Sequence, residues 1–509
     1  MSKIEEVEKI KANYRPFLIF LLAFSVRLLG IASRPIWYDE AFSVLFSEKG
    51  FLPMLYGTLA ATGAGTADIH PLGYYTTLWL WMKVFGESLP AVRTLSILAG
   101  IGVVYMVYAI GQELFGETTA LLAALFTALA PFEIHYAQEI RMYSFMALWL
   151  LLATYAYIRG SRTGQNRWWA LFTLSAALAQ YTQNLSAFYL VVLAITPILQ
   201  RDWKSIKFVF LAGLGALILY IPWLIELPGQ FAKIQQAYWV TRPDLSRLFT
   251  LLLVFVTNLP LPNTLLPIAL FIALITVTIG FLQTIRTARK DDASEGLWTL
   301  YLTFAPPILL FLFSQWRPVY VERALVASGA IFMLWLAWVL TRTKLPRSAV
   351  GLLSFLLAVA SMMGIYTHLT YKDFPYGPFN ELDTYLQTRL MPGDLIVHSN
   401  KLSMLPAIYF DRSLPQAFIG DAPGSPEDTL APATQEVLGV SGQPNIQSAA
   451  GKARRVWYII YQHSINEYQS SGLATTPDLL FLNSHYSLAY KEEWDGLDVY
   501  FFVSGPAPR

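Results

Sequence analysis

Two adjacent carboxylates, Asp39 and Glu40, are the residues of this sequence best suited to do chemistry. They follow the first long apolar run, Pro16 to about Ala32, and therefore come where that run would leave a hydrocarbon phase. An acidic pair at this depth is costly unless it is paired, hydrated or functional. One of them could take a proton from an attacking hydroxyl, or hold a divalent cation against a phosphate. The structural alternative is a helix start, whose positive end favours either carboxylate.

The composition indicates that most of the chain lies in a membrane. Of 509 residues, 55% are hydrophobic and only 14% charged, and the mean hydropathy is +0.45, which is too apolar for a soluble globular protein. The formal charge of +2 gives no bulk attraction to nucleic acid, and no nucleic-acid partner is expected. The chain has no cysteine, which excludes disulfides, thiolate catalysis and Cys-ligated metal, so any metal would need carboxylate, His or water ligands.

Eleven apolar segments are long enough to cross the hydrocarbon core, which predicts a polytopic α-helical membrane protein with about eleven transmembrane helices. They extend over residues 16–32, 90–112, 117–133, 140–158, 167–182, 184–200, 206–225, 262–285, 296–314, 322–341 and 347–369. The segment 74–85 is too short to span and rich in aromatic residues, so we interpret it as an interfacial helix.

Lys and Arg concentrate in alternate short loops, and basic loops are retained on the cytoplasmic side. This predicts a cytoplasmic N-terminus and places residues 33–89, 226–261 and everything after Thr370 on the outer face of an inner or plasma membrane. Residues 1–370 then form the transmembrane domain, with the catalytic motif in its first outer loop, 33–89.

Residues 371–509 differ in character from the rest. Short β-type runs begin at Asp394, Val456 and Leu497, which predicts a small soluble α/β domain outside the membrane. Asn380 is a plausible cap for the helix after it, and residues 421–450 are rich in Pro, Gly, Ser and Thr, as is typical of a long loop.

Four stretches together resemble the C-type membrane glycosyltransferase superfamily. The resemblance is strongest to bacterial relatives of the dolichyl-phosphate-mannose-dependent protein O-mannosyltransferases and to the aminoarabinose transferases of lipid A. In chain order, the stretches are WYDEAFS from Trp37, HPLGYYTTLWLWMKVFGESLPAVRTLSILAG from His70, HYAQEIRMYS from His135, and PVYVERAL from Pro318. Two positions depart from the pattern, because Leu72 replaces the second Pro of HPP and Ala324 replaces the usual Tyr.

The resemblance implies a C-type fold and an inverting transfer of sugar from a polyprenyl-phosphate donor to an acceptor hydroxyl on the outer face. The acceptor stays open between a lipid, a glycan and a protein. Asp39 would be the general base or the cation-binding carboxylate, and Glu40 would support it. A divalent cation (Mg²⁺, Mn²⁺ or Zn²⁺) is compatible with this family, which includes metal-assisted and apparently metal-free members; no other cofactor is expected.

Such a reaction needs positive charge for the departing phosphate. Arg141 and Arg323 are the best candidates because each lies near the outer end of a span, where a bidentate phosphate contact would offset the cost of a guanidinium. Tyr143 and Tyr320 could add hydroxyl donors. The alternative for the two arginines is structural pairing, with Glu139 and Glu322 respectively.

His70 and Glu139 are candidates for contacting substrate or metal. His70 shares the acidic outer loop with Asp39. Glu139 lies four residues after His135, so a helix would place both on one face, although a satisfied interfacial His is the commoner outcome of such a pair.

The rival hypothesis is a transporter or flippase of lipid-linked sugars. It also needs outer-face carboxylates, basic residues and a groove of lipid size, but the chain has no internal repeat or paired broken spans of the kind that support alternating access.

Overall fold

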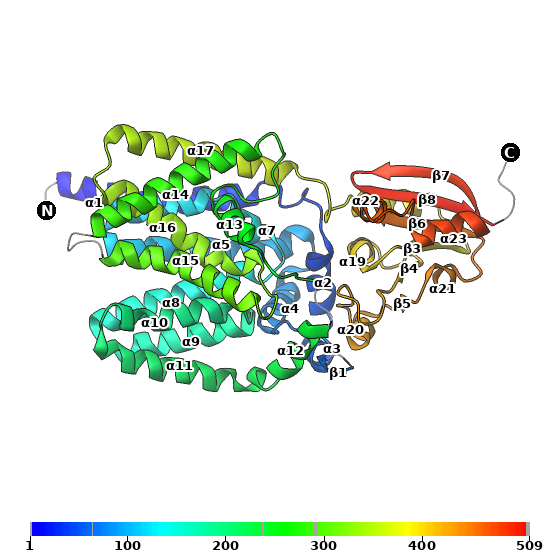
Figure 1. Ribbon diagram of the computed structural model, residues 1–509, viewed down its shortest axis with the longest axis horizontal. Coiled ribbons are helices and arrows are strands. Elements are labelled where there is room, and N and C mark those ends of the chain that lie inside the picture. The colour runs from blue at the N-terminus through cyan, green and yellow to red at the C-terminus, as the bar shows by residue number, and fades with distance from the viewer. Residues whose placement is uncertain (1–2, 64, 237–238, 289–293, 505–509) are drawn as a thin grey trace.

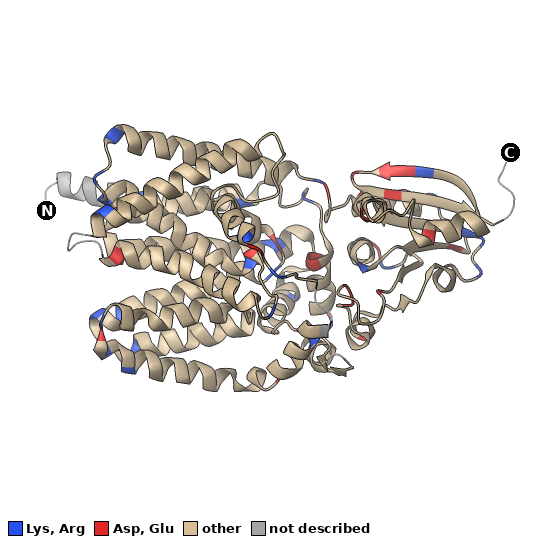
Figure 2. Cartoon of the chain, viewed as in Figure 1, with Lys and Arg blue, Asp and Glu red and all other residues tan. Residues whose placement is uncertain are grey.

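A helical body and a smaller sheet-containing domain make up the structure, which is a computed structural model describing residues 3–63, 65–236, 239–288 and 294–504 (Figure 1). The N-terminus lies at the far end of the helical body from the C-terminal domain. Several of the Lys and Arg positions lie in the loops and helix ends at that same far end (Figure 2). The basic loops and the C-terminal domain are therefore at opposite ends of the molecule.

The helical body contains a helix at each of the eleven segments expected to span. These are α1 (Lys3–Leu28), α5 (Leu89–Phe115), α6 (Glu117–Leu129), α8 (Tyr143–Thr163), α9 (Asn166–Thr182), α10 (Ser186–Leu199), α11 (Trp203–Leu224), α14 (Leu266–Ala288), α15 (Ser294–Ser314), α16 (Val326–Arg342) and α17 (Arg347–Thr370).

Six of the helices in the described part of the chain are long and apolar enough to cross a membrane, or up to seven if a bent pair is one span. The helical membrane class is confirmed, but the number eleven is not. The bent pair is α6 and α7 (Pro131–Gln138), which meet at 57°. Pro131 begins α7, where its missing N–H costs no hydrogen bond. The span expected over 117–133 therefore coincides with α6 and the bend that follows it.

Helix α16 is the centre of the helical body. Its residues from Val326 to Leu340 are all buried, and it packs against α6, α8 and α15. Glycines admit its large side chains: the ring of Trp335 lies over Gly280, and that of Trp338 over Gly296, too close for a Cβ at either position. Small residues of this kind let membrane helices approach closely.

A layer of short elements separates the helical body from the C-terminal domain (Figure 1). It contains α2 (Tyr38–Ser47), α3 (Phe51–Leu59), β1 (Ala61–Thr62), β2 (Gly65–Thr66), α4 (Gly73–Phe85) and α12 (Leu227–Gln236). Helix α13 (Leu245–Thr257) lies in the helical body, against α7 (Pro131–Gln138), α14 and α17. Helix α4 coincides with the expected interfacial segment. It buries Tyr74, Tyr75 and Leu78 against the protein and exposes Leu80 and Val84 on its other face.

The C-terminal domain is built on a six-stranded mixed sheet, which agrees with the expected α/β domain. The strand order is β5-β4-β3-β6-β8-β7, in which β5, β4, β3 and β6 are parallel and the last two are antiparallel. The strands are β3 (Asp394–His398), β4 (Gln416–Ile419), β5 (Gly442–Gln443), β6 (Arg455–Tyr461), β7 (Ser487–Trp494) and β8 (Leu497–Val503). The helices are α18 (Phe379–Gln387), α19 (Lys401–Phe410), α20 (Pro432–Leu438), α21 (Ile446–Ala450), α22 (Gln462–Ser470) and α23 (Pro477–His485).

Two local predictions in this domain are wrong. Helix α18 begins at Phe379, after Pro378, so Asn380 lies inside the helix and is not its cap. The expected loop 421–450 contains α20, β5 and α21, because short elements packed on a sheet can form from turn-rich sequence when tertiary burial outweighs local propensity.

The domain contacts residues 33–89 through several hydrogen bonds. The Thr434 hydroxyl donates to the Gly57 carbonyl (2.8 Å), and the Tyr409 hydroxyl donates to the Glu87 carbonyl (2.7 Å). Helix α19 also packs on α2, which carries the acidic pair. The position of the domain is therefore coupled to the start of α2.

Asp383 gives a test of this fold. It is 3% exposed, and neither carboxylate oxygen has a hydrogen-bond partner. Burial, with a smaller contribution from Asp411, raises the pKa of this carboxyl from 3.8 to about 8. A raised carboxyl pKa means that the folded domain holds a proton which the unfolded chain releases. Stability is therefore lost as the pH rises from about 4 to about 8, by up to about 1.4 kcal/mol per pH unit.

We expect Asp383→Asn to remove this loss, measured as the amide-exchange protection of α18 between pH 5 and 8 after correction for intrinsic exchange. Glu381→Gln, on the exposed face of the same helix, is the control and should leave the pH dependence unchanged. A wild-type protection free energy that does not fall with pH would contradict the assignment.

Candidate active site

Asp39 lies in the first turn of α2, as the structural interpretation of the acidic pair also required. Its Oδ2 atom accepts a hydrogen bond from Arg323 Nη1 (3.2 Å) and lies 3.8 Å from Arg141 Nε. The carboxylate is 18% exposed and the Arg141 side chain only 3%. Three residues far apart in the sequence thus meet at one oxygen atom.

Glu40 points the other way and forms a fully buried ion pair with Arg93, both side chains being 0% exposed. Arg93 Nε donates to Glu40 Oε1 (3.1 Å) and Nη2 to Oε2 (2.9 Å), in the bidentate geometry that gives the strongest such contacts. The remaining N–H groups of Arg93 donate to backbone carbonyls of the 31–35 turn, at 2.8 to 3.2 Å. All five donors of the guanidinium are therefore used.

The same ion pair also holds the segment that carries Arg141. The backbone N–H of Ile140 donates to Glu40 Oε1 (3.1 Å). Glu40 therefore fixes its chain neighbour Asp39 on one side and the chain neighbour of Arg141 on the other. The support expected from Glu40 takes the form of positioning in this geometry.

Arg141 is held by neutral oxygen atoms as well as by Asp39. Its Nη1 donates to the hydroxyls of Ser43 and Tyr75, both at 3.2 Å. The carboxylates expected as structural partners of the two arginines have other contacts. Glu139, the alternative for Arg141, lies 3.2 Å from His135, and Glu322, the alternative for Arg323, accepts from Arg247 at 3.1 Å.

A cavity of about 590 Å³ opens between the helical body and the C-terminal domain. Its lining includes four of the expected site residues: Asp39, His70, Arg141 and Arg323. The volume lies in the range of small-molecule sites. The three residues that meet at Asp39 Oδ2 therefore share one solvent-accessible space with His70.

Tyr143 and Tyr320 are not among the lining residues of this cavity. The ring of Tyr143 lies beneath both arginines, 5.5 Å from the Arg323 guanidinium and 5.9 Å from that of Arg141, which is a cation–π geometry. Tyr320 is 5% exposed and packs on Phe311. Their expected role as hydroxyl donors to phosphate stays a prediction.

His70 contacts the other acid of its loop. His70 Nδ1 lies 2.8 Å from Asp68 Oδ1, which also accepts from the backbone N–H of Ile69 at 2.5 Å. Burial would raise the pKa of Asp68, but these contacts lower it below its usual value.

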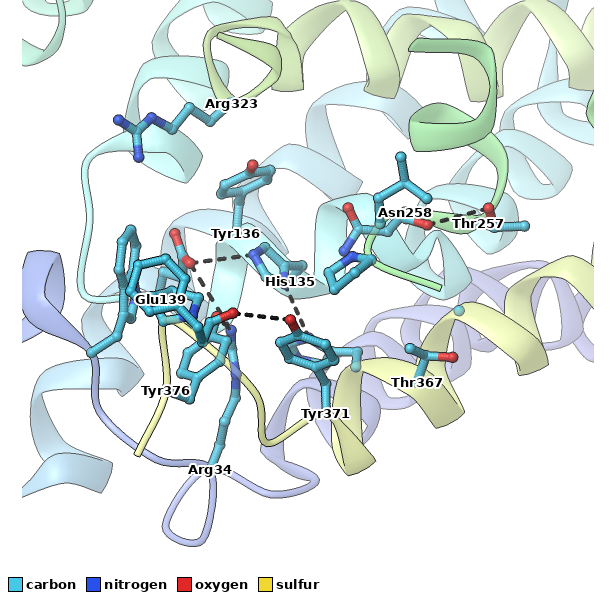
Figure 3. A pocket seen from close by; sticks show the side chains of 17 residues that line it. Arg34, His135, Tyr136, Glu139, Thr257, Asn258, Arg323, Thr367, Tyr371 and Tyr376 are labelled. Carbon is cyan, nitrogen blue, oxygen red and sulfur yellow. Dashed lines mark hydrogen bonds and ion pairs between the residues drawn. The ribbon is translucent and has the colours of Figure 1, made fainter. Parts of the chain in front are cut away.

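Glu139 lines a second, smaller cavity of about 200 Å³ (Figure 3). Arg323 and Trp37 line both this cavity and the large one. In the smaller cavity, Glu139 lies 3.2 Å from His135 and 4.0 Å from Arg34. One nitrogen of Arg34, Nη1, and one oxygen of Glu139, Oε2, are buried without a hydrogen-bond partner.

The side chains around this cavity form a chain of polar contacts. Gln138 donates its amide to two backbone carbonyls, and its Oε1 lies 2.6 Å from His368 Nε2. His368 Nδ1 lies 3.1 Å from His135 Nδ1, and His135 Nε2 lies 3.2 Å from Glu139 Oε1. His135 therefore links Glu139 to helix α17.

Across the described ranges, no three His, Asp or Glu side chains converge as metal ligands. The contacts at the two cavities are pairs, Asp68 with His70 and His135 with Glu139. A divalent cation at this site stays a prediction.

Comparison with known sequences supports the expected family. Residues 69–225 match the family of dolichyl-phosphate-mannose-protein mannosyltransferases. A segment of 178 residues, 33% of the chain, is 30% identical to the undecaprenyl phosphate-alpha-4-amino-4-deoxy-L-arabinose arabinosyl transferase of Pseudomonas aeruginosa strain UCBPP-PA14. The match spans about a third (32%) of that relative's length.

The whole fold is similar to solved structures. The crystal structure of ArnT from Cupriavidus metallidurans bound to undecaprenyl phosphate aligns with 96% of this chain and 99% of its own, with a TM-score of 0.63 and 12% identity. The Archaeoglobus fulgidus oligosaccharyltransferase tethered with an acceptor peptide covers 98% of this chain, with 75% of its own length, a TM-score of 0.53 and 12% identity.

The resemblance to the C-type membrane glycosyltransferases is therefore supported by sequence over residues 69–225 and by the fold of the whole chain. Within that class, the matched segment is similar to the mannosyl and aminoarabinosyl transferases.

Several cavity residues were not expected from the sequence. Lys233, Trp239, Lys401 and Asp421 line the large cavity beside Asp39. Lys401 comes three residues after the end of β3. Because ligand sites of α/β sheets lie at the carboxyl ends of parallel strands, the sequence could have indicated this position. Lys233 and Trp239 belong to the segment 226–261, where no motif marks them.

The ion pair between Glu40 and Arg93 generates a stability prediction. Arg93→Met leaves a buried, unpaired carboxylate, and we expect it to lower the free energy of unfolding by about 3–5 kcal/mol, measured by denaturant titration in mixed micelles. The double variant with Glu40→Met should recover part of this loss.

The control is Arg159→Met, which removes a partly exposed ion pair with Glu113 and should cost less than about 1 kcal/mol. If the Arg93 variant is as stable as this control, the pair does not have the structural role assigned to it.

Proposed function

We propose that this protein is an inverting glycosyltransferase that moves a sugar from a polyprenyl-phosphate donor to an acceptor hydroxyl on the outer face of the membrane. The observation that carries the proposal is the meeting of Asp39 with Arg141 and Arg323 at the wall of the large cavity. It combines a carboxylate for proton transfer with two guanidinium groups for a phosphate.

In the proposed reaction, the acceptor hydroxyl oxygen attacks the anomeric carbon of the donor sugar. The bond from that carbon to the phosphate oxygen breaks, and the polyprenyl phosphate leaves with the electron pair. Asp39 takes the hydroxyl proton. Both arginine contacts are made by Asp39 Oδ2, so Oδ1 is the oxygen assigned to receive the proton. Attack opposite the leaving group inverts the configuration.

Arg141 and Arg323 are the proposed phosphate ligands. Each is partly held by Asp39, and Arg141 is held by two hydroxyls as well, which preorganises the donors before the phosphate arrives. The ring of Tyr143 makes cation–π contacts with both guanidinium groups. The polyprenyl chain would lie among the membrane helices and lipids beside this site.

The outer face is proposed from charge. Basic residues gather at the end of the helical body far from the cavity (Figure 2), and basic loops remain cytoplasmic. The cavity and the C-terminal domain would then be periplasmic or extracellular, in an inner or plasma membrane. The same geometry disfavours the flippase alternative, whose site would lie near the bilayer midplane.

The direct test is transfer of labelled sugar from synthetic polyprenyl-phosphate donors by the purified chain in nanodiscs, with cell-envelope extract supplying acceptors. We expect Asp39→Asn to reduce transfer by about 10²–10⁴-fold, the usual contribution of a positioned acid or base, while the amount of folded protein is unchanged. Asp495→Asn, on the exposed surface of the C-terminal domain, is the control and should retain activity.

Transfer that survives in Asp39→Asn would remove Asp39 from the reaction. If no donor supports transfer but labelled lipid-linked sugar crosses the bilayer of proteoliposomes, the flippase alternative is correct.

The phosphate assignment predicts a different change for Arg323. Arg323→Gln should weaken donor use about ten- to hundredfold in kcat/KM, because a charged hydrogen bond contributes about 1.5–3 kcal/mol, and Arg323→Lys should restore part of it. Arg247→Gln, which removes the exposed partner of Glu322, is the matched control. Equal kcat/KM for the two Gln variants would contradict the assignment.

A further inference from the structure

The large cavity has two ends with different chemistry. The membrane end contains Asp39, Arg141 and Arg323. The other end is built by the C-terminal domain from three separate stretches, residues 400–402 at the start of α19, residues 421–434, and residues 463–467 of α22. Because the C-terminal domain lines one end of the cavity, its side chains can determine which ligand binds there.

The basic groups at the domain end already have partners within the protein. Lys401, 4% exposed, bonds to the Asp421 carboxylate and to the Glu427 carbonyl. Lys233 Nζ donates to the Asp428 carbonyl (2.9 Å), and His463 lies 3.3 Å from Glu467. An anionic ligand would have to break these contacts to gain a cation, so this end favours a neutral ligand.

The remaining polar groups both donate and accept hydrogen bonds. Asn400, Thr429 and Ser464 line this end with an amide and two hydroxyls. Aromatic rings form the wall toward Asp39, including those of Trp37 and Trp239. A sugar ring matches such a lining, because each of its hydroxyls donates and accepts while its C–H faces are apolar.

The other acceptor classes fit this end less well. A peptide bound in extended form would need an open strand edge, and the strand of this sheet nearest the cavity, β3, is paired on both sides. An acyl chain would need an apolar tunnel, which the carboxylates of Asp421 and Glu427 interrupt.

We propose that the domain end of the large cavity is the acceptor site, and that it binds a neutral sugar residue whose hydroxyl faces Asp39. This rests on the proposed function and deepens it, because it makes the C-terminal domain the element that determines acceptor specificity. The transferred sugar is then joined to a glycan by a new glycosidic bond.

The test fills this end with a side chain. Ser464→Trp places an indole on the cavity wall, while Ser470→Trp places the same group on the exposed end of the same helix, α22. The probes are neutral di- to tetrasaccharides of glucose, mannose and galactose, a Ser/Thr-containing peptide, and anionic phospholipid vesicles. Binding to the full chain in nanodiscs is followed by saturation-transfer NMR.

We expect oligosaccharide to bind the wild type and Ser470→Trp, and to bind Ser464→Trp at least tenfold more weakly. In the transfer assay, Ser464→Trp should raise the acceptor KM at least tenfold and leave the donor KM unchanged. Binding of the peptide or the vesicles in place of oligosaccharide, or equal oligosaccharide binding by the two Trp variants, would overturn the proposal.

The glycosyltransferase activity and the acceptor site can be contradicted by different results. Asp39→Asn should bind oligosaccharide like the wild type, since Asp39 serves the reaction and not the domain end. Oligosaccharide binding without transfer from any donor supports the acceptor site and contradicts the glycosyltransferase. Transfer to a hydroxyl that is not on a sugar would support the glycosyltransferase and contradict the sugar-binding acceptor site.

Discussion

The buried ion pair between Glu40 and Arg93 is the interaction on which the rest of the site depends. Two opposite charges without exposure to solvent are stable only when both are fully hydrogen-bonded, and here all five N–H groups of Arg93 have partners. The pair joins the turn after α1, the first turn of α2, helix α5 and the segment before α8. Asp39 and Arg141 are the chain neighbours of groups in this network, so their separation is set by it.

This arrangement separates the two acids of the motif by function. Glu40 is buried and saturated by its contacts, while Asp39 borders the cavity and keeps one oxygen away from the arginines. Adjacent residues near the start of a helix point in directions about 100° apart, which is how one dipeptide can serve both the protein interior and the cavity. In the proposed reaction, the buried pair of Glu40 with Arg93 thus holds Asp39 in place beside Arg141 and Arg323.

Motifs in the sequence mark three residues that the structure brings together. Asp39, Arg141 and Arg323 each lie in a recognisable stretch, and both arginines contact one oxygen atom of Asp39. The partner of Glu40 was harder to predict, because Arg93 is 53 residues away on the next long helix, and sequence spacing indicates contacts only within one element. Hydropathy located the helices, but it could not show which of them cross the membrane. A helix buried in protein and a helix exposed to lipid are both apolar.

The domain end of the cavity was outside the reach of sequence reasoning for a related reason. Residues 421–450 were interpreted as a loop from their composition, yet they form short elements against the sheet, and part of that stretch lines the cavity. Lys233, which belongs to α12, lines the same end of the cavity and donates to the Asp428 carbonyl. The contacts between the C-terminal domain and residues 33–89 bring these residues to the cavity that Asp39 lines.

In the proposed reaction, Arg141 and Arg323 receive the donor phosphate beside Asp39. A cryo-EM structure of the full chain in nanodiscs with a polyprenyl phosphate bound would test this contact directly. We expect phosphate oxygens within hydrogen-bond distance of both guanidinium groups, with the lipid chain leaving the cavity toward the membrane. A phosphate bound elsewhere, with the contacts of Asp39 to both arginines unchanged, would contradict it.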